Sequence, residues 1–338
     1  MTKTLTKIHY LKSPLNYIGG KYRILPQILP LFPKRISTFV DVFCGGCDVS
    51  VNIQPYLDST ISKSTQAKSI LCNDNLCFLM DLYRFLQSNP LQSTLHSLQD
   101  IINTYKLTKQ NAQGYYALRE DYNTDKAPLL LLTLIAFSFN HQIRFNNAHR
   151  FNTPFGKDRS SLNATMQNNL IAFIQALQNK NIAFFSLDFR DMFALLLGSD
   201  NKPLRQESLQ YPKHVSLDSL KLDSQSFVYA DPPYLLTQGT YNDGKRGFSG
   251  WNESLECALL ESLDRLDSKG LRFALSNVLY HKGRTNTLLE QWAKARGYHV
   301  HCINTHYTNA SYHAKHRDKT LTKEVLITNY MPFVDSRI

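Results

Sequence analysis

The tetrapeptide Asp231-Pro232-Pro233-Tyr234 constrains the fold of this chain more than any other stretch. It follows an apolar run from Phe227 to Ala230, which predicts a buried strand ending at the proline pair. Two prolines fix the backbone and remove two N–H donors, so the local carbonyl groups are free to accept hydrogen bonds. The sequence therefore predicts an acidic side chain held at the carboxyl end of a strand.

These groups suit a planar base that carries an amino group. The carboxylate of Asp231 and the carbonyl of Pro232 can each accept one hydrogen of an exocyclic NH2, while Tyr234 stacks on the ring. The nitrogen lone pair then points toward an electrophile. A plain Asp-Pro-Pro turn is the alternative, because Asp and Pro are common turn residues.

Composition sets the class of protein. The 338 residues are 43% apolar, enough for one large or two moderate domains. A net charge of +11 is spread along the chain, which favours a basic face for a polyanion over a disordered basic arm. The longest apolar run, Leu129 to Ala136, is too short to span a membrane, and the first residues lack the layout of a signal peptide. We expect a cytoplasmic protein.

Six cysteines are too few and too scattered for a secreted disulfide scaffold. Cys44 and Cys47 form a C-x-x-C pair, with Cys72 and Cys77 further on, so a zinc or redox site is one interpretation. Small side chains packed in a tight turn explain the pair as well, and we expect no metal.

Two units near the start indicate an α/β sheet that binds a nucleotide. Thr38 to Phe43 predicts a strand that leads through a glycine-containing turn into a helix from Val49 to Tyr56. A second strand, Ser69 to Cys72, is followed by Asp74, which is placed to accept both hydroxyls of a ribose. Before them, Gly19-Gly20-Lys21 offers backbone N–H groups and a cation to an anion, or is a simple helix entry.

A run of helices then interrupts the α/β order, which indicates an inserted domain. The expected helices are Leu76 to Gln87, Leu91 to Tyr105, Gly114 to Tyr122 and Pro128 to Phe139. After them, amide and Arg side chains alternate with Phe between residues 139 and 157. This pattern suits base edges and stacked bases, although a polar surface hairpin would look similar.

The α/β order resumes after the insertion. Expected helices are 170–177, 192–197, 255–266 and 287–295, and expected strands are 182–187, 272–276, 298–303 and 325–329. No helix separates the last two strands, which predicts an antiparallel edge. Residues 58–68 and 198–225 are expected to be polar surface insertions, residues 235–252 a long loop, and residues 306–323 a basic loop facing phosphates.

Taken in order, the motifs resemble those of the Dam-type, or alpha group, N6-adenine DNA methyltransferases across nearly the whole chain. They are Tyr17 to Lys21, Phe43-x-Gly45, Asp74, the helical insertion and Asp231 to Tyr234. Asn140, Arg144 and the run from Phe151 to Gly156 also resemble that family's target-recognition hairpin. The chain departs from the family at Cys47, where the turn usually has its second glycine, and in the long polar loops at 58–68 and 198–225.

The resemblance implies a Rossmann-like, S-adenosylmethionine-dependent methyltransferase sheet formed by residues 1–83 and 165–338. It also implies an inserted, mainly helical target-recognition domain at residues 84–164 that carries a hairpin. The implied reaction is transfer of a methyl group to the N6 amine of an adenine flipped out of duplex DNA, within a restriction–modification system that can include a cognate endonuclease.

By resemblance, residues can be given roles. Asp231, Pro232, Pro233 and Tyr234 are the catalytic set. The residues implied for the cofactor are Tyr17, Lys21, Phe43, Gly45, Asp74, Asp188, Phe189 and Asp231. Those implied for DNA are Phe139, Asn140, Gln142, Arg144, Asn146, Arg150 and Pro154.

The recognition sequence is expected to differ from a plain GATC. Phe139 and Asn140 resemble the residues that wedge beside the vacated stack, and Arg144 resembles the one that forks onto a guanine. Gln142 and Asn16 stand where the GATC-specific members have an apolar residue and a Lys.

Three other classes fit part of the pattern. An RNA or free-nucleobase amino methyltransferase shares the Asp-Pro-Pro-Tyr motif, but the hairpin and helical insertion favour duplex DNA. A DNA-binding module without catalysis leaves four intact residues unexplained, namely Lys21, Asp74, Asp231 and Tyr234. A nicotinamide-dependent dehydrogenase explains neither the Asp-Pro-Pro-Tyr motif nor the basic charge.

Overall fold

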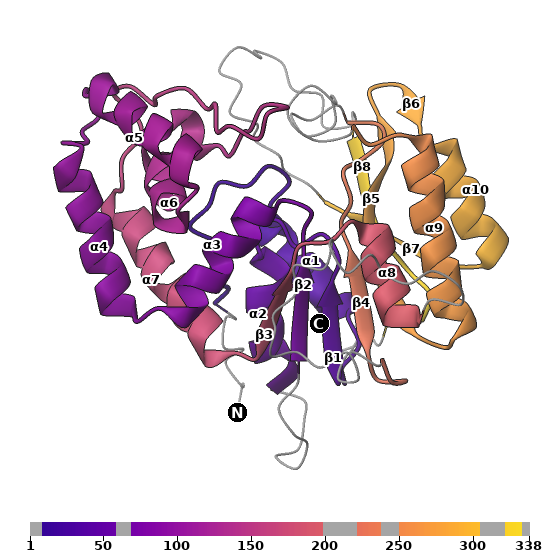
Figure 1. Cartoon of the computed structure of the whole chain (residues 1–338). Coiled ribbons are helices and arrows are strands. Elements are labelled where there is room, and N and C mark those ends of the chain that lie inside the picture. Colours follow the sequence, from indigo (N-terminus) through magenta and orange to yellow (C-terminus); the bar gives the residue numbers. More distant parts are fainter. Residues whose placement is uncertain (1–8, 59–68, 199–221, 238–249, 305–321, 333–338) are drawn as a thin grey trace, which may run out of the picture.

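A single mixed sheet lies at the centre of the computed structural model, which describes residues 9–58, 69–198, 222–237, 250–304 and 322–332 (Figure 1). The strand order is β3-β2-β1-β4-β5-β8-β7, and β6 pairs with β5. The strands are β1 (Thr38–Asp41), β2 (Ser69–Asn73), β3 (Ile182–Phe185), β4 (Phe227–Ala230), β5 (Arg272–His281), β6 (Arg284–Thr285), β7 (His299–Ile303) and β8 (Thr322–Thr328). The predicted α/β class, with a mainly parallel sheet, is confirmed.

Strand direction changes at one end of the sheet. The strands β1 to β5 are parallel to one another, whereas β8 is antiparallel to both β5 and β7. The predicted antiparallel edge is therefore confirmed. The order reverses between β1 and β4, which is the switch point where open α/β sheets bind their ligands.

Helices cover both faces of the sheet, and a further group stands beside it. Figure 1 shows α4 to α7 gathered at one side of the sheet and α9 and α10 at the other. The α-helices are α1 (Leu25–Ile28), α2 (Asp48–Asp58), α3 (Cys77–Ser88), α4 (Leu91–Thr104), α5 (Ala112–Asp125), α6 (Pro128–Phe137), α7 (Ala164–Asn179), α8 (Phe189–Leu197), α9 (Glu253–Ser268) and α10 (Thr287–Arg296). Short 3-10 turns are η1 (Tyr22–Ile24), η2 (Leu29–Leu31) and η3 (Phe139–His141).

Strands β3 and β4 are apolar throughout because both faces of the sheet are buried there. In β4, Phe227 and Tyr229 belong to the core that continues into α2 to α7, whereas Val228 and Ala230 belong to the core under α8, α9 and α10. The predicted strand from Phe227 to Ala230 is confirmed with the same bounds.

Two strands near the carboxyl end are longer than predicted. β5 continues through Asn277 to His281 instead of ending at Ser276, because β8 and β6 pair with this extension. β8 begins at Thr322 instead of Val325, which places Glu324 inside the sheet. Both extensions depend on pairing between distant segments, which local sequence does not encode.

Residues 1–13 are polar and basic without periodicity, which predicts a loose arm, but this prediction is wrong for the part that the structure describes. The amide side chain of Asn52 in α2 accepts a hydrogen bond from the N–H of Leu11 and donates one to its carbonyl, each 2.7 Å long. The N–H of Ser13 donates to Asp48 Oδ1 over 3.2 Å. These bonds fasten residues 11–13 to α2.

Several predictions fall on residues that the structure does not describe. These are the polar insertions 59–68 and 199–221, most of the loop 235–252 (238–249), and the basic loop at 305–321. Within the described residues, no helix has the length and apolar character needed to cross a membrane.

Candidate active site

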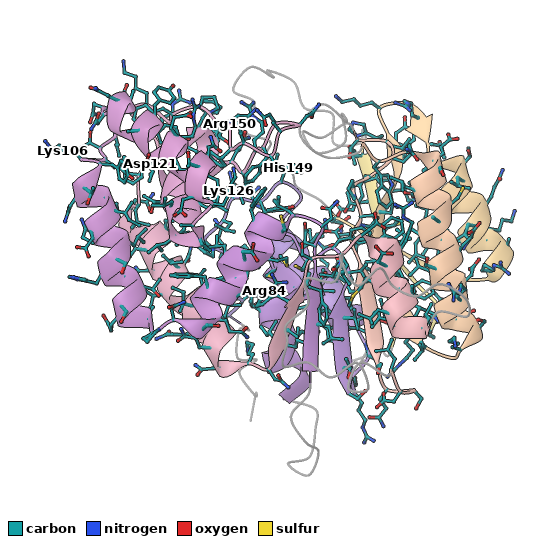
Figure 2. The ribbon with its side chains drawn as sticks, in the orientation of Figure 1. Arg84, Lys106, Asp121, Lys126, His149 and Arg150 are labelled. Atoms are coloured by element: carbon teal, nitrogen blue, oxygen red, sulfur yellow. The ribbon has the colours of Figure 1, made fainter. Side chains whose placement is uncertain are left out.

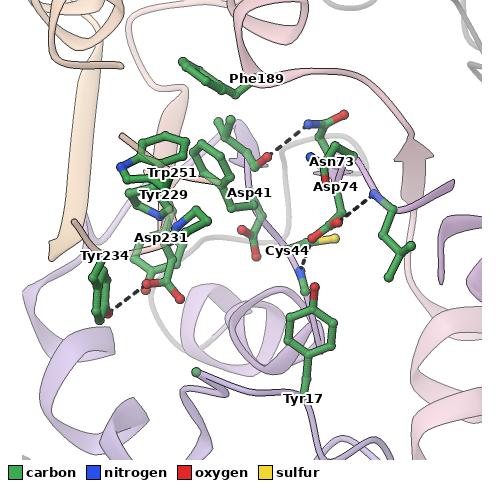
Figure 3. A pocket seen from close by; sticks show the side chains of 18 of the residues that line it. Tyr17, Asp41, Cys44, Asn73, Asp74, Phe189, Tyr229, Asp231, Tyr234 and Trp251 are labelled. Atoms are coloured by element: carbon green, nitrogen blue, oxygen red, sulfur yellow. Dashed lines mark hydrogen bonds between the residues drawn. The ribbon is translucent and has the colours of Figure 1, made fainter. Parts of the chain in front are cut away.

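A cavity of about 520 Å³ opens at the carboxyl ends of β1, β2 and β4 (Figure 3). Its volume lies in the range of small-molecule and cofactor sites. The cavity brings together every residue predicted for catalysis or for the cofactor, namely Tyr17, Lys21, Phe43, Gly45, Asp74, Asp188, Phe189, Asp231, Pro232, Pro233 and Tyr234.

Asn73 at the end of β2 holds the floor of the cavity in place. Its Nδ2 donates to the carbonyls of Val42 and Leu187, each over 3.0 Å, and its Oδ1 accepts from the N–H of Leu187 at 2.9 Å. Because the side chain is buried, each bond satisfies a backbone group that water cannot reach. The segments after β1, β2 and β3 are thereby fixed in register.

The turn after β1 requires glycine at position 45. Gly45 has a φ of +45°, and a Cβ there would lie 2.7 Å from the ring of Tyr17. Its N–H donates to Asp74 Oδ2 over 3.1 Å, and its carbonyl accepts from the Tyr83 hydroxyl at 2.7 Å. The turn therefore lets the backbone approach a ligand closely while Asp74 stays oriented.

Cys47 also has a positive φ, of +59°. Only glycine adopts this conformation without strain. This is a physical reason for the glycine that the family named in the sequence analysis usually has at this position. The buried sulfur of Cys47 packs in the core, which offsets part of this strain.

Three thiols gather behind this turn. The Sγ atoms of Cys44, Cys47 and Cys72 all lie within 4.8 Å of one another, and Cys77 is outside this group. The Met80 sulfur lies 3.9 Å from Cys44 Sγ. Three thiol ligands are one fewer than a structural zinc site uses.

A buried cluster of charges forms the opposite wall. Lys21 Nζ lies 2.9 Å from Asp231 Oδ2, donates to the Tyr234 hydroxyl over 2.8 Å, and lies 3.7 Å from Glu324 Oε1. The same hydroxyl lies 3.0 Å from Asp231 Oδ1 and 3.0 Å from Glu324 Oε1. Asp231, Tyr234, Lys21 and Glu324 thus form one hydrogen-bonded unit.

The charge of Asp231 is set by competing effects. Burial raises the pKa of the Asp231 carboxyl above its usual value, the ammonium of Lys21 lowers it, and the nearby charge of Glu324 raises it. The net direction is upward.

The positions of Lys21 and Tyr234 add to what the sequence predicted. Lys21 was expected to face a ligand anion, yet its ammonium group is buried and paired with protein carboxylates. Tyr234 was expected to stack on a base, and its hydroxyl joins the charged cluster. Sequence reasoning missed Glu324, although an acid directly before the apolar run from Val325 was a usable signal.

Aromatic rings form a third wall. The Phe43 and Phe189 ring centroids lie 5.6 Å apart, and the Trp251 ring lies 5.8 Å and 5.5 Å from them. Such a wall suits a flat aromatic ligand. Trp251 was missed because the polar sequence around it gave only a loop.

Two further buried acids line the cavity. Asp41 Oδ2 accepts from the Ser50 hydroxyl over 2.6 Å, whereas its Oδ1 has no hydrogen-bond partner among the described residues. Burial raises the pKa of Asp41, and it raises the pKa of Asp48 to about 6. Neither acid was predicted as part of the site.

The segment predicted to meet DNA is an irregular hairpin. Two isolated bridges, Ser138 with Phe155 and Phe145 with Phe151, replace regular strands. Arg144 is held on the hairpin because its Nε donates to Asn152 Oδ1 and its Nη2 to the Asn152 carbonyl, each over 2.9 Å.

The predicted DNA residues at the two ends of this hairpin lie close together. Phe139 is 42% exposed, and its N–H donates to the Pro154 carbonyl over 2.8 Å. Asn16, beside the cavity residue Tyr17, donates from Nδ2 to the carbonyl of Asn140 over 2.8 Å. The hairpin and the cavity are therefore linked by a direct hydrogen bond.

The tip of the hairpin carries basic groups (Figure 2). Asn146 Oδ1 accepts from the N–H groups of Ala148 and Arg150, which shapes the tip. Lys126 Nζ donates to the His149 carbonyl over 2.9 Å, and Arg150 pairs with Glu120.

The sequence of the chain is similar to those of several known proteins. Residues 17–201 match the family model of D12 class N6 adenine-specific DNA methyltransferases. The modification methylase StsI of Streptococcus sanguinis is 41% identical over 321 residues, and the type II methyltransferase M.FokI of Planomicrobium okeanokoites is 40% identical. Both alignments cover 95% of this chain but only 43% of the relative, so the chain spans less than half the length of these proteins. A DNA adenine methylase of Salmonella typhi is 24% identical over 85% of each chain.

The raised pKa of Asp48 makes a prediction about stability. An acid whose pKa is higher in the folded than in the unfolded state contributes stability that is lost as the pH rises from the unfolded to the folded pKa. Asp48→Asn removes this loss. The unfolding free energies of variant and wild type are measured by urea denaturation at about pH 4 and about pH 7. From the lower to the higher pH, the difference between them should shift by about 2 to 3 kcal/mol in favour of the variant.

The exposed Asp125→Asn is the matched control and should track wild type at both pH values. If the unfolding free energies of Asp48→Asn and wild type change equally with pH, the raised pKa of Asp48 is contradicted.

Proposed function

Because this chain belongs to the D12 class of N6 adenine-specific DNA methyltransferases, we propose that it transfers a methyl group from S-adenosylmethionine to the N6 amine of an adenine in duplex DNA. One observation carries the proposal: the Asp231-Pro232-Pro233-Tyr234 turn opens into the same cavity as Gly45 and Asp74. An amine-binding turn and a nucleotide-binding turn thus share one space.

The residues around the cavity fit S-adenosylmethionine. Asp74 is oriented at the end of β2, where an acid accepts ribose hydroxyls. The rings of Phe43, Phe189 and Trp251 form a wall for an adenine. Asp41 Oδ1 offers a buried acceptor to a ligand donor. When bound, S-adenosylmethionine supplies a methyl carbon activated by a positively charged sulfur.

The turn after β4 orients the target amine. Asp231 and the Pro232 carbonyl each accept one amine hydrogen, which aims the nitrogen lone pair across the cavity. Lys21 holds the Asp231 carboxylate through Oδ2, and Pro232 and Pro233 limit backbone movement. A stacked adenine cannot reach this cavity, so it must rotate out of the duplex at a cost of a few kcal/mol.

We assign target recognition to residues 84–164. The exposed ring of Phe139, with Asn140 beside it, fills the space that the flipped base leaves. Arg144, already oriented by Asn152, forks onto a guanine, and Gln142 contributes to a site that differs from GATC. The bond from Asn16 to Asn140 holds this hairpin beside the cavity.

The proposed role in a restriction–modification system rests on the names of two relatives. StsI and LlaI are named modification methylases, which supports a role for this chain beside a cognate restriction endonuclease. Because those proteins are more than twice as long, the proposal concerns the reaction of this chain alone.

The central prediction concerns Asp231→Asn, which keeps the shape of the side chain and removes its charge. Methyl transfer to duplex DNA should fall by about a hundredfold or more, because the amine loses an ionised acceptor. The assay is incorporation of labelled methyl groups, run in parallel on duplex DNA and on structured RNA.

Binding of duplex DNA by Asp231→Asn should remain, because the hairpin is unchanged, and the exposed Asp100→Asn should keep full activity. Full activity in Asp231→Asn, or a preference for RNA in wild type, would refute the assignment.

A matched pair of Arg variants tests recognition. Arg144→Ala should relax one guanine position and cost about 1 to 3 kcal/mol of discrimination, because it removes a base-edge contact. Arg150→Ala should weaken binding evenly across sequences, as loss of a phosphate contact does. Mapping of methylated adenines in DNA from a host that expresses each variant gives the readout.

An unchanged methylated motif in Arg144→Ala, or an altered motif in Arg150→Ala, would show that the two residues have been assigned the wrong roles.

A further inference from the structure

Glu324 in β8 is a buried acid beside the proposed site that no motif predicted. Only 1% of its surface is exposed, and its Oε1 lies 3.0 Å from the Tyr234 hydroxyl. Its Oε2 has no hydrogen-bond partner among the described residues. Its Oε1 is paired with Lys21 and Tyr234, whereas its Oε2 is a buried acceptor without a donor in the described part of the chain, which costs free energy.

Counting hydrogens in the cluster shows what Glu324 can do. The Tyr234 hydroxyl has one hydrogen and lies 3.0 Å from both Asp231 Oδ1 and Glu324 Oε1. It can donate to only one of these carboxylates at a time, so the other contact lacks a hydrogen while both acids are ionised. Methylation of an amine releases one proton.

The charges lead to the same conclusion. Lys21 Nζ lies 2.9 Å from the Asp231 carboxylate and 3.7 Å from that of Glu324. With the amine protonated and both acids ionised, the three groups sum to minus one. This sum balances the single positive charge of a sulfonium methyl donor. After methyl transfer the sulfur is neutral, and a proton retained on one carboxylate restores the balance in a region poor in water.

We propose that Glu324 is a positioning residue that accepts the reaction's proton through Tyr234, an inference that rests on the proposed function. The nitrogen–carbon bond forms, and the carbon–sulfur bond breaks with its electron pair on sulfur. One N–H proton passes to Asp231 Oδ1 and on to the Tyr234 oxygen, while Tyr234 passes its own hydroxyl proton to Glu324 Oε1. Asp231 ends ionised, still paired with Lys21.

Glu324→Gln tests this role because it keeps the shape and removes the proton acceptor. In single-turnover methyl transfer on bound duplex DNA, the variant should be about tenfold or more slower than wild type near neutral pH. This difference in rate between variant and wild type, the gap, should narrow as the pH rises toward about 9, because solvent base then takes the proton. The exposed Glu261→Gln in α9 is the control and should match wild type.

A merely electrostatic role predicts the opposite trend. The charge of Glu324 raises the pKa of Asp231, so Asp231 would stay ionised to lower pH in Glu324→Gln. The rate of methyl transfer by the variant would then fall least, relative to wild type, under acidic conditions. A gap that is constant, or that widens as the pH rises, therefore overturns the proposal.

Two further measurements keep the test decisive. Glu324→Gln should bind S-adenosylhomocysteine within about twofold of wild type by calorimetry, which reports an intact cavity. If Glu324→Gln fails to fold by circular dichroism, Tyr234→Phe replaces it, because this variant keeps both carboxylates and removes the connecting hydroxyl. The difference in rate between Tyr234→Phe and wild type should also narrow as the pH rises, and a constant difference overturns the role of Glu324. A wild-type chain that methylates no DNA overturns the proposed function itself, whereas active wild type with a constant gap overturns only the role of Glu324.

Discussion

The ion pair between Lys21 and Asp231 is the contact on which the candidate site depends. Both charges lie in a region largely closed to water, where an unpaired charge would cost several kcal/mol. Through Tyr234, the pair also includes Glu324. It therefore joins three distant parts of the chain: the loop before α1, the turn after β4, and β8. The site exists only when all three are in place.

The parallel sheet supplies the second constraint. Because parallel strands end at one edge, Gly45, Asp74 and Asp231 meet there although they are far apart in sequence. The Asn73 side chain at the end of β2 fixes the segments that follow β1 and β3, and Gly45 lets the turn after β1 approach a ligand. The hairpin from Phe139 reaches the same edge through the bond between Asn16 and Asn140. The hairpin proposed to recognise a base and the cavity proposed to bind a nucleotide therefore lie side by side.

Local sequence predicted the elements and most cavity residues because these depend on short-range patterns. The run Phe227 to Ala230 gave a strand with correct bounds, and the order of motifs gave the family. What it missed depends on contacts between distant segments. Glu324 became part of β8 through pairing with β5, Trp251 packs on Phe43 and Phe189, and the backbone of Leu11 pairs with Asn52. No local pattern encodes such contacts.

The most direct test of the account is a crystal structure of the chain with S-adenosylhomocysteine. The ligand should occupy the cavity at the ends of β1, β2 and β4, with its ribose hydroxyls on Asp74, its adenine against Phe43, Phe189 and Trp251, and its sulfur facing Asp231. A ligand bound elsewhere, or one whose sulfur lies away from Asp231, would contradict the claim that one cavity holds both the methyl donor and the target amine.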